Sequence, residues 1–204
     1  MQPILREGIT LYGAGGHCKV VLDILESNGL KAEQIVDDAP VENIFMGLPL
    51  SKAGIEYDKA IITIGNCSVR KKIAEKISVN KYLKAIHPSS IICRNVPIGD
   101  GTVIVHGAIV QSSAKIGKHC ILNTKSSIGH DVIINDFVHV ASGATICGGS
   151  QIGECTWIGA GSVIRQGIHI GKNCMIGAGS IVVKDIPDNV VAFGNPCRII
   201  RENE

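Results

Sequence analysis

Aliphatic residues occur at every sixth position through the second half of the chain, without a slip over seventeen positions. They are Ile86, Ile92, Ile98, Ile104, Val110, Ile116, Leu122, Ile128, Ile134, Val140, Ile146, Ile152, Ile158, Ile164, Ile170, Ile176 and Val182. The next position is often glycine, and the fourth position after the aliphatic residue is usually small or β-branched. A period of six is typical of a solenoid with three short strands in each coil of about 18 residues. The pattern therefore predicts a hexapeptide β-helix.

The first 86 residues follow a different pattern. Strands are predicted at 8–12, 34–36 and 59–64, with a further short segment at 44–50. A glycine-rich turn at 13–19 precedes a helix whose buried side holds Val20, Val21, Ile24 and Leu25. A second helix follows the turn Gly65-Asn66 and has Val69, Ile73 and Ile77 on one side. This alternation predicts a small Rossmann-like βαβ domain with a parallel sheet.

The segment His87-Pro88-Ser89 marks the passage between the two patterns. We expect residues 1–86 to form the βαβ domain and residues 87–190 the β-helix, with 191–204 as a C-terminal tail.

The composition agrees with this division. The chain has 204 residues with 24 glycines, 33 isoleucines and only seven aromatic residues, and 16 of the glycines lie at or beyond residue 99. Stacked coils form columns of Ile and Val with little room for rings. The eight cysteines include no CxxC pair, which favours reduced thiols over disulfides or zinc. Cys120 and Cys174 fall on small corner positions and are expected to fill them.

Charge and hydropathy exclude several classes of protein. A net charge of +2, with no basic cluster interleaved with aromatic residues, argues against a nucleic-acid partner. No apolar run approaches the ~20 residues that span a bilayer, and the N-terminus lacks the apolar region of a signal peptide. We expect a cytoplasmic protein with no membrane insertion.

The phase of the repeat places every histidine of the β-helix on the outside. A single outward histidine is most often a solvated surface group. His130 differs because Asp131 follows it, and a carboxylate beside a histidine can orient the imidazole and raise its basicity. A metal site is the alternative for these histidines. However, His106 and His130 lie one coil plus one side apart, on different faces of one chain, so no metal is expected within it. Histidines of neighbouring subunits could still converge on a metal, but no spacing in the sequence supports such a site.

The turn Gly13-Ala-Gly-Gly-His17 lies between a predicted strand and a predicted helix. Glycines there allow backbone N–H groups and the helix N-terminus to approach a phosphate. A tight strand-to-helix turn without a ligand explains the same residues. Asp37 and Asp38 follow the second strand, where acidic side chains can accept hydrogen bonds from a nucleotide, or can be a solvated turn.

These motifs together resemble the bacterial NeuD/PglD-type sugar acyltransferases. The resemblance covers nearly the whole chain and is carried by GAGGHCKVV, the IGN turn at 64–66, HPS at 87–89, the unbroken hexapeptides, GHD at 129–131 and the terminal GNPCRII. The family includes acetyl-CoA-dependent N-acetyltransferases of nucleotide-linked 4-amino sugars and sialic acid O-acetyltransferases. The resemblance implies a left-handed parallel β-helix and a homotrimer, with acetyl-CoA in the groove between neighbouring helices.

The resemblance also implies roles for individual residues. His130 matches the catalytic base, Asp131 the acidic residue that polarises it, and Gly148 the glycine whose N–H faces the thioester carbonyl. His139, Ala160 and Ala178 match contacts to acetyl-CoA. Contacts to the sugar nucleotide are expected from Gly15, Gly16, His17, Asp37, Asp38 and Gly65.

The resulting hypothesis is acetyl transfer from acetyl-CoA to the amine of a nucleotide-linked, UDP-type 4-amino sugar, with no covalent acyl-enzyme. O-acetylation of a sialic acid or another sugar is an alternative that needs the same base but no diphosphate cradle. A non-catalytic solenoid scaffold, with the N-terminal domain as a ligand sensor, is a second alternative.

Overall fold

A computed structural model describes residues 8–203. Its N-terminal domain is a six-stranded sheet in the order β3-β4-β2-β1-β5-β6 with two helices. All neighbouring strands are parallel except the edge pair of β3 and β4. The elements are β1 (Ile9–Tyr12), α1 (Gly16–Ser27), β2 (Ala32–Asp37), β3 (Ile44–Phe45), β4 (Leu48–Lys52), β5 (Glu56–Ile62), α2 (Cys67–Lys76) and β6 (Ser78–Tyr82). The predicted βαβ domain is therefore confirmed.

The second helix differs in one respect from the prediction. Asn66 caps α2 by accepting a hydrogen bond from the Val69 N–H (3.0 Å). The side of α2 that faces the interior carries Cys67, Arg70 and Ile73, whereas Val69 is 42% exposed. Val69 therefore does not share the buried side with Ile73, and Arg70 lies on that side instead.

The β-helix consists of two-residue strands in three parallel sheets. Sheet I contains β7 (Ala85–Ile86), β9 (Val103–Ile104), β12 (Ile121–Leu122), β15 (His139–Val140), β18 (Trp157–Ile158) and β21 (Met175–Ile176). Sheet II contains β8 (Ile91–Ile92), β10 (Ile109–Val110), β13 (Ser127–Ile128), β16 (Thr145–Ile146), β19 (Val163–Ile164) and β22 (Ile181–Val182). Sheet III contains β11 (Lys115–Ile116), β14 (Ile133–Ile134), β17 (Gln151–Ile152) and β20 (His169–Ile170).

Each coil stacks directly on the next. Leu122 pairs with Val140, and Val140 in turn pairs with Ile158, so residues 18 apart lie side by side. From Ile104 to Val182, the aliphatic residues of the six-residue series are at most 4% exposed. The three series members before Ile104 are only partly buried, because they lie in the first coil. The predicted columns of aliphatic side chains are confirmed.

The corner cysteines are part of this core. Cys120 and Cys174 are buried, and each thiol donates to a main-chain carbonyl at 3.0 Å. Burial raises the pKa of Cys120 to about 12, so this thiol stays protonated at neutral pH. All eight cysteines are free.

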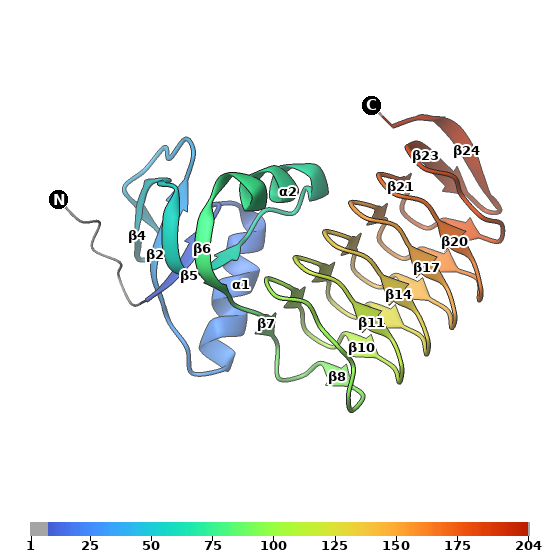
Figure 1. Ribbon diagram of the computed structural model, residues 1–204, viewed down its shortest axis with the longest axis horizontal. Helices are drawn as coiled ribbons and strands as arrows, with labels where there is room; N and C mark the ends of the chain where they lie inside the picture. Colours follow the sequence, from blue (N-terminus) through green and yellow to red (C-terminus); the bar gives the residue numbers. More distant parts are fainter. Residues whose placement is uncertain (1–7, 204) are drawn as a thin grey trace.

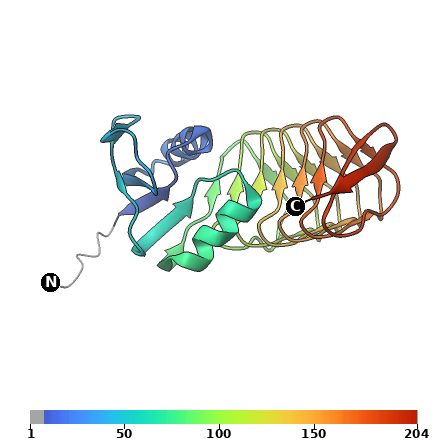
Figure 2. The same ribbon diagram turned by 90° about the horizontal axis from the view of Figure 1, so that it is seen from above.

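The C-terminal segment closes the stack. β23 (Val190–Gly194) pairs in parallel with β21, and β24 (Cys197–Glu202) turns back to pair antiparallel with β23. The segment expected as a tail thus extends sheet I. Figures 1 and 2 show this hairpin at one end of the β-helix and the N-terminal domain at the other, with α2 beside the coils. No helix of residues 8–203 is long and apolar enough to cross a membrane.

Candidate active site

The glycine turn lies where three neighbouring parallel strands end. β2, β1 and β5 are adjacent, so the residues after their carboxyl ends meet at one edge of the sheet. Thr63, buried after β5, donates its hydroxyl hydrogen towards the Gly13 carbonyl (2.6 Å) and the Tyr12 carbonyl (2.9 Å). Gly13 has φ +112°, and a Cβ there would collide with Ile64. Gly13 is therefore required by the fold itself.

Gly15 and Gly16 are glycines for a different reason. A Cβ at either position would meet nothing within 4 Å, so packing does not exclude a side chain. Within residues 8–203, no acceptor pairs with the N–H groups of Gly15, Gly16 or His17, and the first turn of α1 has no acidic side chain. Unpaired N–H groups at a helix N-terminus attract anions. The turn therefore has open space and donors suited to a phosphate.

The two predicted acidic residues have different surroundings. Asp37 accepts hydrogen bonds from the Ala14 N–H (2.9 Å) and the Ala39 N–H (3.1 Å), so its carboxylate holds the glycine turn against β2. Asp38 is exposed and accepts from Tyr12 Oη (2.8 Å) and Lys76 Nζ (3.0 Å). The hydrogen bond from Lys76 lowers the pKa of Asp38, with Tyr12 contributing in the same direction. Both carboxylates lie at the strand ends where the sequence predicted them.

The N-terminal domain covers part of sheet I, and this corrects one expectation. His119 and His139 point outward from the β-helix as predicted, but each is only 5% exposed because the domain packs over them. The His119 ring stacks on Phe137 with centroids 5.0 Å apart and meets Tyr82 edge-on at 4.5 Å. The expectation that every outward histidine is accessible was therefore wrong for these two.

His139 joins the β-helix to the glycine-turn edge of the sheet. Its Nδ1 lies 3.1 Å from the Gly65 carbonyl and its Nε2 lies 3.2 Å from Asn123 Nδ2. Because a carbonyl only accepts and the amide nitrogen only donates, Nδ1 carries the proton of the neutral ring. The ring lies 6.5 Å from His17 and 4.1 Å from Trp157, between centroids. The structure thus brings together three predicted residues, His17, Gly65 and His139.

Burial keeps both of these histidines neutral. It lowers the pKa of His17 to about 3, with the neighbouring His139 and Arg70 acting in the same direction. It lowers the pKa of His139 to about 4, against an opposing contribution from the hydrogen bond to Gly65. His17 Nε2 is buried and has no hydrogen-bond partner among the described residues. These rings present uncharged polar groups beside the glycine turn.

His130 and Asp131 form the predicted pair. His130 Nδ1 lies 2.7 Å from Asp131 Oδ2, so the short aspartate side chain does reach the imidazole. Asp131 adopts a left-handed backbone conformation with φ +59°. Asp tolerates this conformation better than most residues, and the Asp131 N–H is held by the Ser112 carbonyl (3.1 Å). A charged carboxylate only accepts, so Nδ1 carries the proton and Nε2 keeps its lone pair.

Gly148 lies one coil beyond His130 and directly against its ring. A Cβ at Gly148 would fall 2.5 Å from His130 Nε2 and 2.6 Å from its Cε1. Among residues 8–203 the Gly148 N–H has no hydrogen-bond acceptor. An unpaired N–H beside a histidine nitrogen with a free lone pair is an arrangement that can assist acyl transfer.

The residues at the glycine turn and the pair of His130 and Gly148 lie on different sides of the molecule. His130 is in the turn between β13 of sheet II and β14 of sheet III. The N-terminal domain contacts sheet I and its two corners, through His106, Phe137 and Glu154 among others. His130 therefore occupies the corner opposite the covered sheet. Ala160 and Ala178 lie exposed in the turns between sheets I and II, on successive coils.

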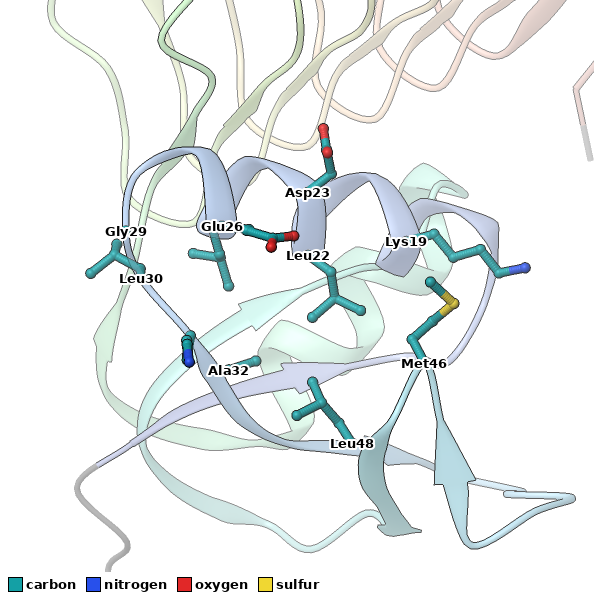
Figure 3. A pocket seen from close by; sticks show the side chains of 11 residues that line it. Lys19, Leu22, Asp23, Glu26, Gly29, Leu30, Ala32, Met46 and Leu48 are labelled. Carbon is teal, nitrogen blue, oxygen red and sulfur yellow. The ribbon is translucent and has the colours of Figure 1, made fainter.

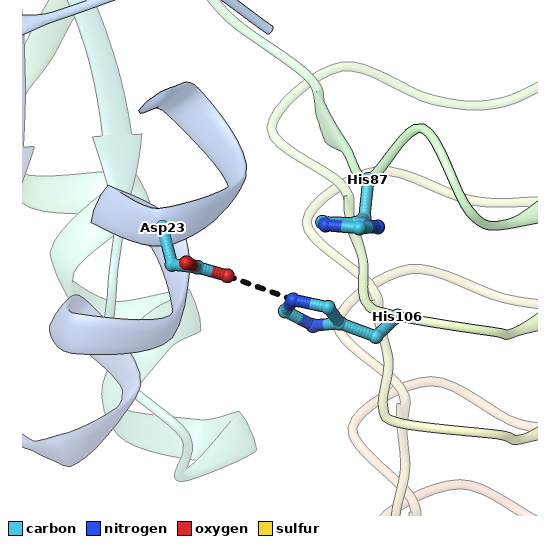
Figure 4. A group of neighbouring side chains, drawn as sticks. All are labelled: Asp23, His87 and His106. Carbon is cyan, nitrogen blue, oxygen red and sulfur yellow. Dashed lines mark ion pairs between the residues drawn. The ribbon is translucent and has the colours of Figure 1, made fainter. Parts of the chain in front are cut away.

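A further cluster joins α1 to the first coils. His106 Nε2 lies 2.7 Å from Asp23 Oδ2, and the rings of His87 and His106 stack with centroids 3.7 Å apart (Figure 4). The Ser89 N–H donates to His87 Nδ1 at 3.0 Å, which places the proton of the neutral ring on Nε2. The possible metal-ligand atoms of Asp23, His87 and His106 lie within 4.8 Å of one another. However, His87 directs an N–H, rather than a lone pair, towards this point. This arrangement favours a hydrogen-bonded contact between domains over a metal site.

A cavity of about 430 Å³ lies between α1 and the segment before β4 (Figure 3). Its walls include Leu22, Leu30, Met46 and Leu48, and none of the predicted site residues. We do not assign it to the site.

Sequence reasoning missed Thr63, Arg70, Asn123 and Trp157. Arg70 had a detectable signal, because an arginine three residues after Cys67 and three before Ile73 falls on the buried side of a helix. The others have no local signal, since each acts through a contact distant in sequence.

Comparisons with known proteins agree with both halves of the structure. The PglD N-terminal domain matches residues 8–77, and the bacterial transferase hexapeptide (six repeats) matches residues 149–184. UDP-N-acetylbacillosamine N-acetyltransferase of Bacillus subtilis (strain 168) is 37% identical over 113 residues, which are 48% of this chain and 51% of that protein. The match thus spans about half the length of that relative.

Two further relatives match more of the chain. GDP-perosamine N-acetyltransferase of Escherichia coli O157:H7 is 30% identical over 160 residues, covering 77% of this chain and 68% of that protein. The crystal structure of a variant perosamine N-acetyltransferase from Caulobacter crescentus, with CoA and GDP-perosamine, superposes with a TM-score of 0.89. It is 28% identical and covers 96% of this chain and 97% of that one. The chain therefore belongs to the family of hexapeptide-repeat sugar acetyltransferases that carry a PglD N-terminal domain.

Proposed function

We propose that the protein transfers the acetyl group of acetyl-CoA to the amino group of a nucleotide-linked 4-amino sugar. The observation that carries the proposal is the arrangement of His130 between Asp131 (2.7 Å) and the unpaired N–H of Gly148. The open glycine turn at Gly15 and Gly16, with its unpaired N–H groups, supports a nucleotide diphosphate as the group that anchors the sugar.

Each residue has a chemical task in this reaction. His130 Nε2 accepts a proton from the sugar amine as the amine attacks the thioester carbon, and Asp131 stabilises the imidazolium that forms. The Gly148 N–H donates to the oxygen that becomes negatively charged. The imidazolium then returns the proton to the thiolate of coenzyme A as the carbon–sulfur bond breaks. No cysteine of the protein is needed as an acyl carrier.

We propose UDP as the nucleotide. Of the two curated relatives described, the one named for a UDP-sugar is 37% identical and the one named for a GDP-sugar is 30% identical. The exposed Asp38 and the fixed Asp37 are the side chains assigned to the nucleoside, and Gly15, Gly16, His17 and Gly65 to the diphosphate and its surroundings. His139, Ala160 and Ala178 are assigned to acetyl-CoA.

We propose further that the working unit is a homotrimer in which neighbouring copies complete the site. The glycine turn lies beside sheet I, where His17 and Gly65 are next to His139, whereas His130 lies at the corner opposite that sheet. A single chain does not bring its own His130 to its own glycine turn. A neighbouring β-helix that presents its His130 beside the glycine turn would enclose a groove for acetyl-CoA. Acetyl-CoA and sugar nucleotides are both cytoplasmic metabolites. The proposed activity therefore requires a cytoplasmic location.

A turnover assay tests the activity. Purified protein is incubated with acetyl-CoA and, separately, with UDP- and GDP-linked 4-amino sugars, and the release of coenzyme A thiol is followed together with the mass of the product. We expect a mass increase of one acetyl group and highest kcat/KM with a UDP-sugar. Preference for a GDP-sugar would correct the nucleotide assignment. Absence of turnover with every sugar, together with no acetyl-CoA binding by calorimetry, would instead favour a scaffold.

A further inference from the structure

Arg70 is a buried cation that is held entirely by main-chain oxygens. The residue is 1% exposed, and its guanidinium donates four hydrogen bonds of 2.7–2.9 Å to carbonyl groups. In the described part of the chain no carboxylate forms an ion pair with it. A buried charge is costly unless its donors are satisfied, so this arginine must do something that an apolar side chain would not.

The four carbonyls come from both domains. Two belong to the turn after β5, where Nη1 donates to Ile64 (2.8 Å) and Gly65 (2.9 Å). Two belong to the same corner of successive coils of the β-helix, where Nε donates to His119 (2.8 Å) and Nη2 to Phe137 (2.7 Å). One planar group thus fixes the glycine-turn edge of the N-terminal sheet to two coils of the β-helix.

The Gly65 carbonyl connects Arg70 to His139. A carbonyl oxygen has two lone pairs, and here one accepts from Arg70 Nη1 and the other from His139 Nδ1 (3.1 Å). This oxygen and Asn123 Nδ2, on the other side of the ring, together hold the His139 ring and place its proton on Nδ1. Arg70 sets the position of this oxygen without touching His139.

We propose that Arg70 is a positioning residue of the site: it fixes the Gly65 turn of the sugar-nucleotide half and, through the Gly65 carbonyl, helps to fix the ring and tautomer of His139. The inference rests on the proposed function only in that Gly65 and His139 face substrate. The positive charge of Arg70 also adds to the effect of burial in keeping the pKa values of His17 and His139 low. Movement of this charge would therefore change the pKa values of both histidines.

Lysine cannot replace arginine here. A lysine ammonium is a point donor with three tetrahedral N–H bonds, whereas the guanidinium is a planar fork that reaches acceptors on three sides. Arg70→Lys keeps the charge and leaves some of the four carbonyls unpaired, and Arg70→Met keeps much of the volume and removes all four bonds. The two variants separate the geometry of the group from its charge.

Lys71 provides a matched control. It is the next residue on α2, and its Nζ also joins the N-terminal domain to the β-helix through Glu154 Oε2 (2.9 Å). Among residues 8–203, no hydrogen bond joins the Lys71 side chain to the Gly65 turn or to His139. Lys71→Met therefore removes one interdomain contact and leaves the Arg70 geometry intact.

The experiment compares full-length wild type, Arg70→Lys, Arg70→Met and Lys71→Met, at a temperature where circular dichroism shows all of them folded. Histidine side-chain ¹⁵N spectra report the His139 tautomer, and steady-state kinetics with a UDP-linked 4-amino sugar report KM and kcat. We expect a single Nδ1–H tautomer of His139 in wild type and Lys71→Met, and an averaged signal in both Arg70 variants. We expect the KM for the sugar nucleotide to rise by about tenfold to 10²-fold in the Arg70 variants.

Two results would overturn the inference. One is an unchanged His139 spectrum in Arg70→Met, and the other is kinetics of both Arg70 variants within about twofold of Lys71→Met. If wild type turns over no sugar nucleotide, the proposed function fails, and the His139 spectra alone then decide the role of Arg70. A purely structural role would lower the melting temperature of the Arg70 variants without changing the tautomer of the folded protein.

Discussion

The imidazole of His130 lies against the α-carbon of Gly148, so closely that a methyl group there would fall 2.5 Å from Nε2. The two residues are 18 positions apart and occupy the same corner of successive coils. The glycine is thus needed for the space that its missing side chain leaves, whereas any residue other than proline would supply the N–H.

Gly148→Ala tests this relationship. The added methyl must push the His130 ring away from its position, so we expect kcat to fall by about 10²-fold. The fold should survive, because the ring is at the surface and can move outward. Gln166→Ala, an exposed substitution at the same corner one coil further on, is the control and should leave kcat unchanged. Wild-type kcat in Gly148→Ala would show that the ring position is unimportant.

His130→Ala should remove general-base help, which is worth about 10²–10⁴-fold. The His130 side chain is 67% exposed, so the melting temperature should change little. His169→Ala is a matched control, because His169 is another exposed β-helix histidine, in sheet III. The measurements are kcat and the melting temperature of both variants. Near-normal turnover by His130→Ala would exclude this residue as the base.

A site shared between copies predicts complementation between inactive variants. Gly16→Asp places a carboxylate in the open space of the glycine turn, and His130→Ala removes the base. Coexpression with random assortment should leave about a quarter of all sites intact, and copurified trimers that contain both variants should have about one site in three intact. Each variant alone should be inactive. If the mixed trimers are also inactive, the site lies within one chain.

The buried histidines predict a specific response to acid. Burial lowers the pKa of His119 to about 4, whereas an unfolded histidine takes up its proton near pH 6.5. Between these values the unfolded state binds more protons, so the free energy of unfolding falls as the pH falls. The loss is about 1.4 kcal/mol per pH unit for each such histidine.

His119→Phe isolates this contribution. Phenylalanine keeps the stacking on Phe137 and removes His119 Nδ1, a buried nitrogen with no hydrogen-bond partner among the described residues. Urea unfolding at several pH values between 7 and 5 gives the free energy of unfolding. This free energy should fall less steeply with pH in the variant, because unfolding takes up about one proton fewer. Identical slopes for variant and wild type would mean that His119 is accessible to protons in the folded state.

Features that follow from the repeat or from residues adjacent in sequence could be predicted from the sequence. The inward positions from Ile104 to Val182 follow from a period that any reader can count, and the His130–Asp131 contact required only that neighbouring side chains meet. The burial of His119 and His139 could not be predicted in this way. The periodicity shows that a side chain points out of the β-helix, whereas only the docked domain determines what lies outside it. The helix spacing of Arg70 indicates its burial, but its four hydrogen-bond acceptors could not be predicted, because they are main-chain carbonyls distant in sequence or in the adjoining turn.

The antiparallel pairing of β24 bears on whether these molecules associate end to end at high concentration. The last coil of a parallel solenoid offers a strand edge onto which another chain could add in the same direction, as in the growth of a fibre. Because β24 runs back against β23, that edge is occupied by a strand of opposite polarity, with charged Arg198, Arg201 and Glu202 along it. The hairpin thereby replaces the parallel edge of sheet I with an antiparallel, charged one, which disfavours addition of another chain in the same direction at that sheet.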